Sequence, residues 1–406
     1  MFSFSYSCFL RNIIASGAVL FLFSCGSGDT TPPLETTDSI LPKKADTLTQ
    51  EAPPKIEVRR NFDRTPDDIA LFLAGLPPRD KSLIDPAYRE SPEWKKYASI
   101  AKGRWKVFDS TRVSKISLWR DQELDALNKE IKTLYYPFSG PDILNANLFF
   151  PQAKEYIMVG LEPVGEIPFT EKYVVDTLGK YFQSVNNSLY AILNFSFFRT
   201  VAMKKDLQGE QVNGTTPLML LFLSRRGNEI IEVKKVSLSP EGNLQYSESG
   251  KPKGVEITFR KDTLSPEQKV IYFRADLSNE GMLKTNLELK KFISSKGTVH
   301  TYLKSASYLM HNKFFSEVRD QILAQSKGLL QDDSGIPYSF FDKSIWDITL
   351  YGKYTGTISL FKNEYQADYK EAFSQDSAAR KLKPLPFGIG YKWHEGTSNL
   401  LMARKK

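Results

Sequence analysis

The stretch 133-TLYYPFSGPDILNANLFFPQAKEYIMVGLEP-163 contains the signals that decide the fold class. It begins with a short apolar, β-prone run, TLYYPF, and ends with a second one, EYIMVGLEP. Between them, the segment DILNANLFF places Ile143, Ala146 and Phe150 at helical spacing, and Pro151 ends it. A strand, a turn, a short helix and a second strand form a βαβ unit, so we expect the two strands to be parallel neighbours.

The turn between the first strand and the helix has the composition of a helix start. We interpret Ser139 as the capping residue, Gly140 as permissive backbone, Pro141 as the first helical residue and Asp142 as an acid near the positive end of the helix dipole. Glu162 closes the second strand. Open α/β sheets bind ligands at the carboxyl ends of their strands, which makes Ser139, Gly140, Asp142 and Glu162 candidate ligand-binding residues. A purely structural turn is the alternative.

Elsewhere in the chain, helical and strand patterns interleave. They predict an α/β fold with a mixed sheet, a helical N-terminal part at residues 58–132 and an α/β body at 133–406 with a β-hairpin-rich middle section. A subdivision of the body is predicted near residue 205. Residues 216–246 begin with the apolar run TPLMLLFLS and continue with alternation and turns, which favours strands and hairpins over the whole segment.

Three further segments carry structural predictions. In residues 91–119, the side chains of Trp94, Tyr97, Ala101, Trp105 and Phe108 recur three or four positions apart on one helix face. We expect this stripe to be core; a glycan-binding surface is the alternative. Residues 313–330 read as one amphipathic helix, and residues 383–406 as an ordered tail that packs on the body or lines a pocket.

A pair of acids lies in a loop between a predicted helix and a predicted strand. Asp332 and Asp333, followed by Ser334 and Gly335, could ligate a hard cation through oxygen, although their spacing is not that of an EF-hand and a tight loop explains them equally. If Asp142, Glu162 and Asp333 converge, they would suit a carboxylate-dependent hydrolase acting on a glycan or on a metal-assisted substrate. Asp332 and Asp333 are therefore further candidate ligand-binding residues.

The N-terminus has the order of a bacterial secretion signal. Arg11 precedes an apolar run that ends in Leu22-Phe23-Ser24-Cys25, a sequence that resembles a lipobox, with lipidation of Cys25. Residues 1–24 are thus predicted to be a lipoprotein signal peptide. An uncleaved anchor and a plain signal peptide with a chance cysteine are the alternatives. Residues 25–57 contain the lipidated Cys25 and a Thr- and Pro-rich segment with too few apolar residues to fold, which predicts a disordered tether.

Composition excludes several classes of site. Cys8 would leave with the signal and Cys25 would carry lipid, so the mature chain would have no thiol for a disulfide, a nucleophile or a cysteine-ligated metal. The three histidines show no metal-ligand spacing, and no metal or cofactor is implied. The net charge of +8 is scattered in short pairs rather than gathered in a stripe, which does not indicate a nucleic-acid partner.

Two resemblances to known proteins extend these predictions. A glycine turn at Gly140 is followed about 20 residues later by an acid, Glu162. This arrangement resembles the first βαβ unit of Rossmann-like folds, namely class I methyltransferases or dehydrogenases. That resemblance implies a nucleoside-containing ligand with the acid at its ribose. The sequence departs from the motif in having one glycine and in Pro141, which lacks an amide for a phosphate. The predicted compartment also contains little of either cofactor.

The lipobox, the tether and a body rich in Phe, Tyr and Lys resemble the envelope lipoproteins of Bacteroidetes-type bacteria, to which we can attach no activity. The expected function is a membrane-anchored envelope lipoprotein that binds a ligand or partner outside the cytoplasm; the hydrolase is the alternative. Its expected partners are the membrane, through Cys25, and envelope glycans or another envelope protein. Its expected location is the bacterial cell envelope, lipid-anchored on the periplasmic or surface face.

Overall fold

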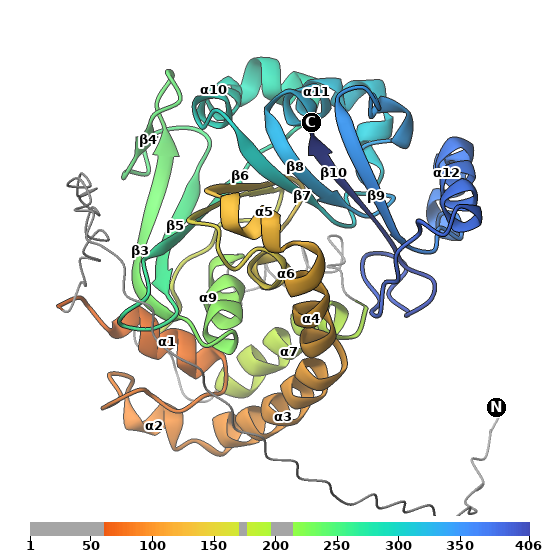
Figure 1. The fold of residues 1–406 in the computed structure, drawn as a ribbon. Helices are drawn as coiled ribbons and strands as arrows, with labels where there is room; N and C mark the ends of the chain where they lie inside the picture. The colour runs from red at the N-terminus through yellow and green to blue at the C-terminus, as the bar shows by residue number, and fades with distance from the viewer. Residues whose placement is uncertain (1–60, 170–176, 196–213) are drawn as a thin grey trace, which may run out of the picture. The chain divides into compact units, whose positions relative to one another are not determined.

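The computed structural model describes residues 61–169, 177–195 and 214–406 (Figure 1). It is an α/β fold with a ten-stranded mixed sheet, which confirms the predicted fold class. The predicted signal peptide and the predicted tether lie outside the described residues.

Five parallel strands form the centre of the sheet. They are β1 (Thr133–Tyr136), β2 (Glu155–Gly160), β6 (Gln268–Arg274), β7 (Val299–Leu303) and β8 (Ser326–Gln331). Their spatial order is β6-β2-β1-β7-β8, so β1 pairs in parallel with β2 on one side and with β7 on the other. The parallel pairing of β1 and β2 confirms the predicted βαβ unit. Numbered along the chain, the order is 3-2-1-4-5, which reverses direction at β1; doubly wound sheets bind ligands at such a reversal.

Antiparallel strands extend the sheet at both edges. They are β3 (Glu229–Leu238), β4 (Leu244–Gln245), β5 (Gly254–Arg260), β9 (Trp346–Gly352) and β10 (Asn399–Lys405). On one edge β5, β3 and β4 follow β6, and on the other β10 lies between β8 and β9. The C-terminal segment predicted as a packed tail therefore ends in a sheet strand. Its pairing with β8 and β9 could not be read from the tail alone, because it depends on strands distant in sequence.

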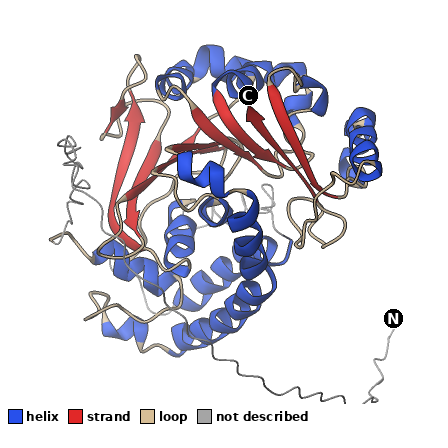
Figure 2. Cartoon of the chain, in the orientation of Figure 1, coloured by secondary structure: helices blue, strands red, loops and turns tan. Residues whose placement is uncertain are grey.

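The helices lie on both faces of the sheet (Figures 1 and 2). One face is covered by α1 (Thr65–Leu73), α3 (Pro92–Phe108), α4 (Ser114–Glu123), α6 (Ile143–Phe149), α7 (Leu178–Phe195) and α9 (Thr216–Arg225). The other is covered by α10 (Leu287–Ser295), α11 (Ser316–Gln325) and α12 (Ala367–Ala378). Two short helices, α2 (Pro86–Arg89) and α5 (Asp125–Glu130), complete the set of α-helices described here.

The N-terminal helices contribute an aromatic core. A π-helical turn, Asp109–Val113, joins α3 to α4, and Ser91 caps α3 by accepting a hydrogen bond from the Trp94 amide. The predicted stripe on α3 is core: Tyr97 stacks on Phe182 of α7 with ring centroids 4.2 Å apart, and Trp94 is partly buried against the same cluster. This packing leaves no continuous aromatic face on α3 for a glycan.

Two predictions of element type were wrong. The apolar run that begins at Thr216 forms helix α9, not a strand, and every residue from Thr216 to Ser224 is buried. An element that is apolar on all sides has no periodicity, so sequence alone cannot separate a buried strand from a buried helix. The predicted helix 313–330 ends at Gln325, and the chain continues directly as β8.

Candidate functional site

A cavity of about 340 Å³ lies where the sheet order reverses. Its walls come from the segments that follow β1, β2, β6 and β7, together with Tyr391 near the C-terminus. Apolar side chains make up much of the lining, with polar groups among them, which is the usual composition of a small-molecule site. The apolar members are Phe138, Val159, Leu161, Ala275, Leu277, Ala306, Leu309 and Phe315.

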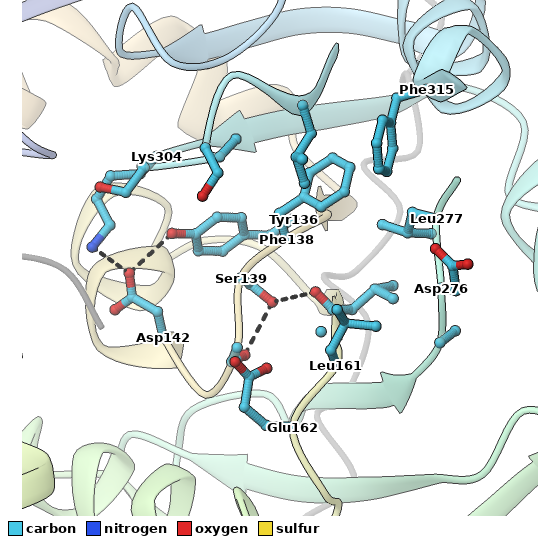
Figure 3. A pocket seen from close by; sticks show the side chains of 18 of the residues that line it. Tyr136, Phe138, Ser139, Asp142, Leu161, Glu162, Asp276, Leu277, Lys304 and Phe315 are labelled. Carbon is cyan, nitrogen blue, oxygen red and sulfur yellow. Dashed lines mark hydrogen bonds and ion pairs between the residues drawn. The ribbon is translucent and has the colours of Figure 1, made fainter. Parts of the chain in front are cut away.

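The turn after β1 forms the floor of this cavity (Figure 3). Phe138 and Gly140 both have left-handed backbone conformations, with φ of 58° and 53°. The Ser139 hydroxyl donates to the carbonyls of Val159 and Gly140, at 3.3 and 3.0 Å, and so ties the turn to the end of β2.

Ser139 does not cap the helix, contrary to the prediction. The cap of α6 is Asp142, whose carboxylate accepts from the Asn145 amide at 3.2 Å. The two left-handed residues lengthen the turn, so the helix begins at Ile143 rather than at Pro141. The proline therefore lies in the turn, and the predicted first-turn acid is the cap itself.

Asp142 also forms a buried ion pair with Lys304, the residue that follows β7. The Lys304 Nζ lies 2.7 Å from Oδ2, and the two side chains are 2% and 1% exposed. The Tyr136 hydroxyl and the Asn145 Nδ2 each donate to the same carboxylate at 2.9 Å. Burial and the Asp142 charge raise the pKa of Tyr136, which keeps it a donor. The positive and negative charges thus compensate each other beside the cavity.

Glu162 follows β2 and folds back over two glycines. A Cβ on Gly160 would come within 2.5 Å of the Glu162 Oε2, and one on Gly140 within 3.5 Å. The Tyr272 hydroxyl donates to the Glu162 carbonyl at 2.9 Å. Glu162 is only 4% exposed, and Gly160 is the glycine that makes room for its carboxylate, since 3.5 Å at Gly140 is an ordinary contact distance.

The upper wall is a strained segment after β7. Ser305, Ser307 and Tyr308 all have φ between 53° and 55°, a conformation that costs energy in residues other than glycine. The Asp332 carboxylate accepts from the Ser305 amide at 2.9 Å, and the Ser334 hydroxyl from the Ala306 amide at 2.7 Å. Interactions from the segment after β8 therefore hold this wall in place.

Asp332 and Asp333 lie behind that wall and are not among the residues that line the cavity. Asp332 also accepts from the amide of Ser334, and Asp333 accepts from the Tyr308 hydroxyl and the Asn399 side chain. Burial and the adjacent Asp333 raise the pKa of Asp332. Both carboxylates accept hydrogen bonds from neighbouring segments, so we interpret this loop as a structural support, or brace, for the segment after β7.

Of the six residues predicted from the sequence, Ser139, Gly140, Asp142 and Glu162 line one cavity. The sequence prediction missed Lys304, Asp276 and Tyr391, which also line it. Asp276 had a usable signal, because it ends a strand pattern next to the βαβ unit. Lys304 had no such signal, because a single lysine after a strand does not indicate a ligand site.

In the described ranges 61–169, 177–195 and 214–406, no three His, Cys, Asp or Glu residues lie close enough to hold a metal ion together. No helix in those ranges is both long and apolar enough to cross a membrane. No protein-family model matches the sequence, and no curated protein is significantly similar to it.

Proposed function

We propose that this chain is an envelope lipoprotein, anchored through Cys25, whose α/β body binds a small organic ligand in the cavity between the ends of β1, β2, β6 and β7. The position and composition of the cavity support the proposal of ligand binding. The cavity lies where the strand order reverses, and it combines apolar walls with a few polar groups. The anchor rests on the sequence from Leu22 to Cys25.

The charges around the cavity restrict the ligand. Lys304 is the cationic residue of the lining, and its charge is compensated by Asp142 at 2.7 Å. The other charged lining residues are the acids Glu162 and Asp276. An anionic group placed here would meet unfavourable charge and few donors, so the cavity favours a neutral or cationic ligand with an apolar part.

A nucleoside is the first ligand of this kind to test. The resemblance to the first βαβ unit of class I methyltransferases or dehydrogenases supports it, since acids follow two adjacent strands, Glu162 after β2 and Asp276 after β6. Carboxylates there can accept from ribose hydroxyls. A dinucleotide is disfavoured, because Pro141 has no amide to offer a pyrophosphate.

The alternative, a carboxylate hydrolase, has less support. A glycosidase pair needs two carboxyl groups about 5–9.5 Å apart that face the same substrate. Asp142 is paired with Lys304, and Asp333 accepts from Tyr308 and Asn399 outside the cavity lining. No described observation favours this reaction over binding.

Isothermal titration calorimetry of the full chain with adenosine, S-adenosylmethionine and NAD tests the ligand proposal. Leu161 lines the cavity and is 49% exposed, so Leu161→Asp removes an apolar contact at little cost to folding. We expect it to weaken binding by about tenfold. Leu264→Asp is the matched control, since Leu264 is 79% exposed and lies outside the cavity. Equal losses in the two variants, or no binding of any nucleoside by the unchanged chain, would contradict the nucleoside proposal.

A further inference from the structure

A second cavity, of about 480 Å³, lies at the opposite edge of the same strands. Pro151, Gln152 and Lys154 line it just before β2 begins, and residues 265–268 line it where β6 begins. The first cavity lies beyond the other ends of β2 and β6. A strand of six residues such as β2 spans about 20 Å, so the two cavities are separate sites.

This second cavity is basic, whereas the first is not. Arg120, Lys154, Arg226 and Lys261 line it, against one acid, Glu267. Arg120 is oriented by Asp121, whose carboxylate lies 2.6 Å from its Nη2, and is therefore partly compensated. The cationic character of the cavity comes mainly from the remaining three side chains.

Arg226 and Lys261 are held close together despite their like charges. The Lys261 Nζ donates to the Arg226 backbone carbonyl at 2.6 Å. Burial, and the nearby charge of Arg226, lower the pKa of Lys261. Burial also lowers the pKa of Arg226. Asp109 opposes that change, and Arg120 adds to it. Two neighbouring cations at a partly buried site are a costly arrangement that a bound anion would relieve.

One donor in this cluster has no acceptor. The Arg226 Nε is buried and has no hydrogen-bond partner in the part of the chain that the structure describes. A nitrogen with almost no accessible surface cannot itself reach a ligand in the cavity, so the other guanidinium nitrogens of Arg226, a lining residue, would make that contact. Guanidinium groups bind tetrahedral oxyanions through charge-assisted hydrogen bonds.

We propose that the cavity formed by Arg226, Lys261, Lys154 and Arg120 is a binding site for a phosphate-type oxyanion. The oxyanion is either a free phosphate or phosphorylated small molecule, or the headgroup of an anionic phospholipid. The Arg226 guanidinium supplies hydrogen-bond donors, and Lys261 and Lys154 supply further positive charge. This site is independent of the ligand proposed for the first cavity.

The test is an isothermal titration calorimetry experiment in which the full chain is titrated with inorganic phosphate at pH 7 and constant ionic strength. We expect phosphate to bind, and Arg226→Gln combined with Lys261→Gln to weaken it by at least about tenfold. Lys261→Gln alone removes an exposed charge and keeps the test valid if the double variant does not fold. Lys284→Gln is the matched control, because Lys284 is 73% exposed and lies outside this cavity.

A second arm uses vesicles of phosphatidylglycerol with vesicles of phosphatidylcholine as reference. Phosphate binding that depends on Lys261 supports a soluble oxyanion. Binding only to the anionic vesicles, with the same dependence on Lys261, supports a headgroup. Binding to neither, or binding that Lys261→Gln and Lys284→Gln reduce equally, overturns the proposal.

Discussion

Asp142 and Lys304 join the beginning of α6 to the end of β7 through an ion pair that is almost completely buried. The pair spans the point at which the strand order reverses, and Tyr136 and Asn145 complete the bonding of the carboxylate. It fixes two walls of the first cavity relative to each other. It also compensates the charge of Lys304, the cation among the described residues that line that cavity.

Removing one member of this pair should destabilise the protein strongly. We expect Lys304→Met to lower the free energy of unfolding by about 3–5 kcal/mol, because it leaves a buried carboxylate without its counter-charge. Urea denaturation measures this. Lys129→Met provides the control: the Lys129–Asp125 pair is 74% and 55% exposed, and its loss should cost at most about 0.5 kcal/mol. Similar losses in the two variants would contradict a structural role for the Asp142–Lys304 pair.

Replacing Gly160 by alanine should destabilise the protein for steric reasons. In Gly160→Ala the new methyl group would meet the Glu162 Oε2 at 2.5 Å and the Tyr272 hydroxyl at 2.8 Å. We expect a loss of about 1–3 kcal/mol in the free energy of unfolding. Gly103→Ala in helix α3 has no atom within 4 Å of the new carbon and should instead stabilise by about 0.5–1 kcal/mol. Opposite signs in the two denaturation experiments are the expected result.

Acidification from pH 7.5 to 5 should remove the stability that two buried histidines contribute, whereas protonation of Asp332, whose pKa burial raises to about 6, acts in the opposite direction. Burial lowers the pKa of both His300 and His311 from 6.5 to about 4, so the folded state keeps them neutral where the unfolded chain binds a proton. Their contribution is therefore complete above pH 6.5 and is lost progressively toward pH 4. At pH 5 His300 should account for a loss of about 2 kcal/mol. His311 should account for less, because its Nδ1 lies 3.2 Å from the Glu364 carboxylate, which favours the protonated form.

Denaturation at the two pH values checks the contribution of these histidines. His300→Gln should reduce the loss of stability between pH 7.5 and 5 by about 2 kcal/mol, and replacing both histidines by Gln should reduce it further. An unchanged pH dependence in the double variant would show that other groups are responsible.

The brace behind the cavity should be visible in hydrogen exchange. Ser334→Ala removes the hydroxyl that accepts from the Ala306 amide, so we expect faster exchange of that amide. Ser344→Ala removes an exposed hydroxyl bonded to Asp342 and should leave Ala306 protected. If Ser334→Ala also leaves the amide protected, the wall is held by other contacts and the brace is not needed.

The membrane anchor is tested separately. Cells producing the unchanged chain should incorporate labelled palmitate into it, and Cys25→Ala should abolish the label, whereas Cys8→Ala should not. Label that persists in Cys25→Ala would exclude lipidation at this residue.

Local sequence patterns were sufficient to predict an element when its own residues show the periodicity or the turn signals of that element. The local patterns at residues 133–163 predicted the strand, helix, strand order of β1, α6 and β2 correctly, although the helix start was placed two residues early, at Pro141 instead of Ile143. The stripe on α3 was likewise correct, because one polar face remained to reveal the period. The run from Thr216 was misassigned because burial on every side erased that period.

The sequence by itself determined the α/β class, the βαβ unit and four residues that line the cavity, Ser139, Gly140, Asp142 and Glu162. These follow from short-range rules: turn residues, periodicity and the alternation of strands with helices. The folded arrangement was needed to show that Lys304 neutralises Asp142, that Asp332 accepts a hydrogen bond from the wall of the cavity, and that Arg226 and Lys261 meet at the opposite edge. The physical reason is that charge compensation and burial depend on which strands become neighbours, and that choice is made by packing of the whole sheet.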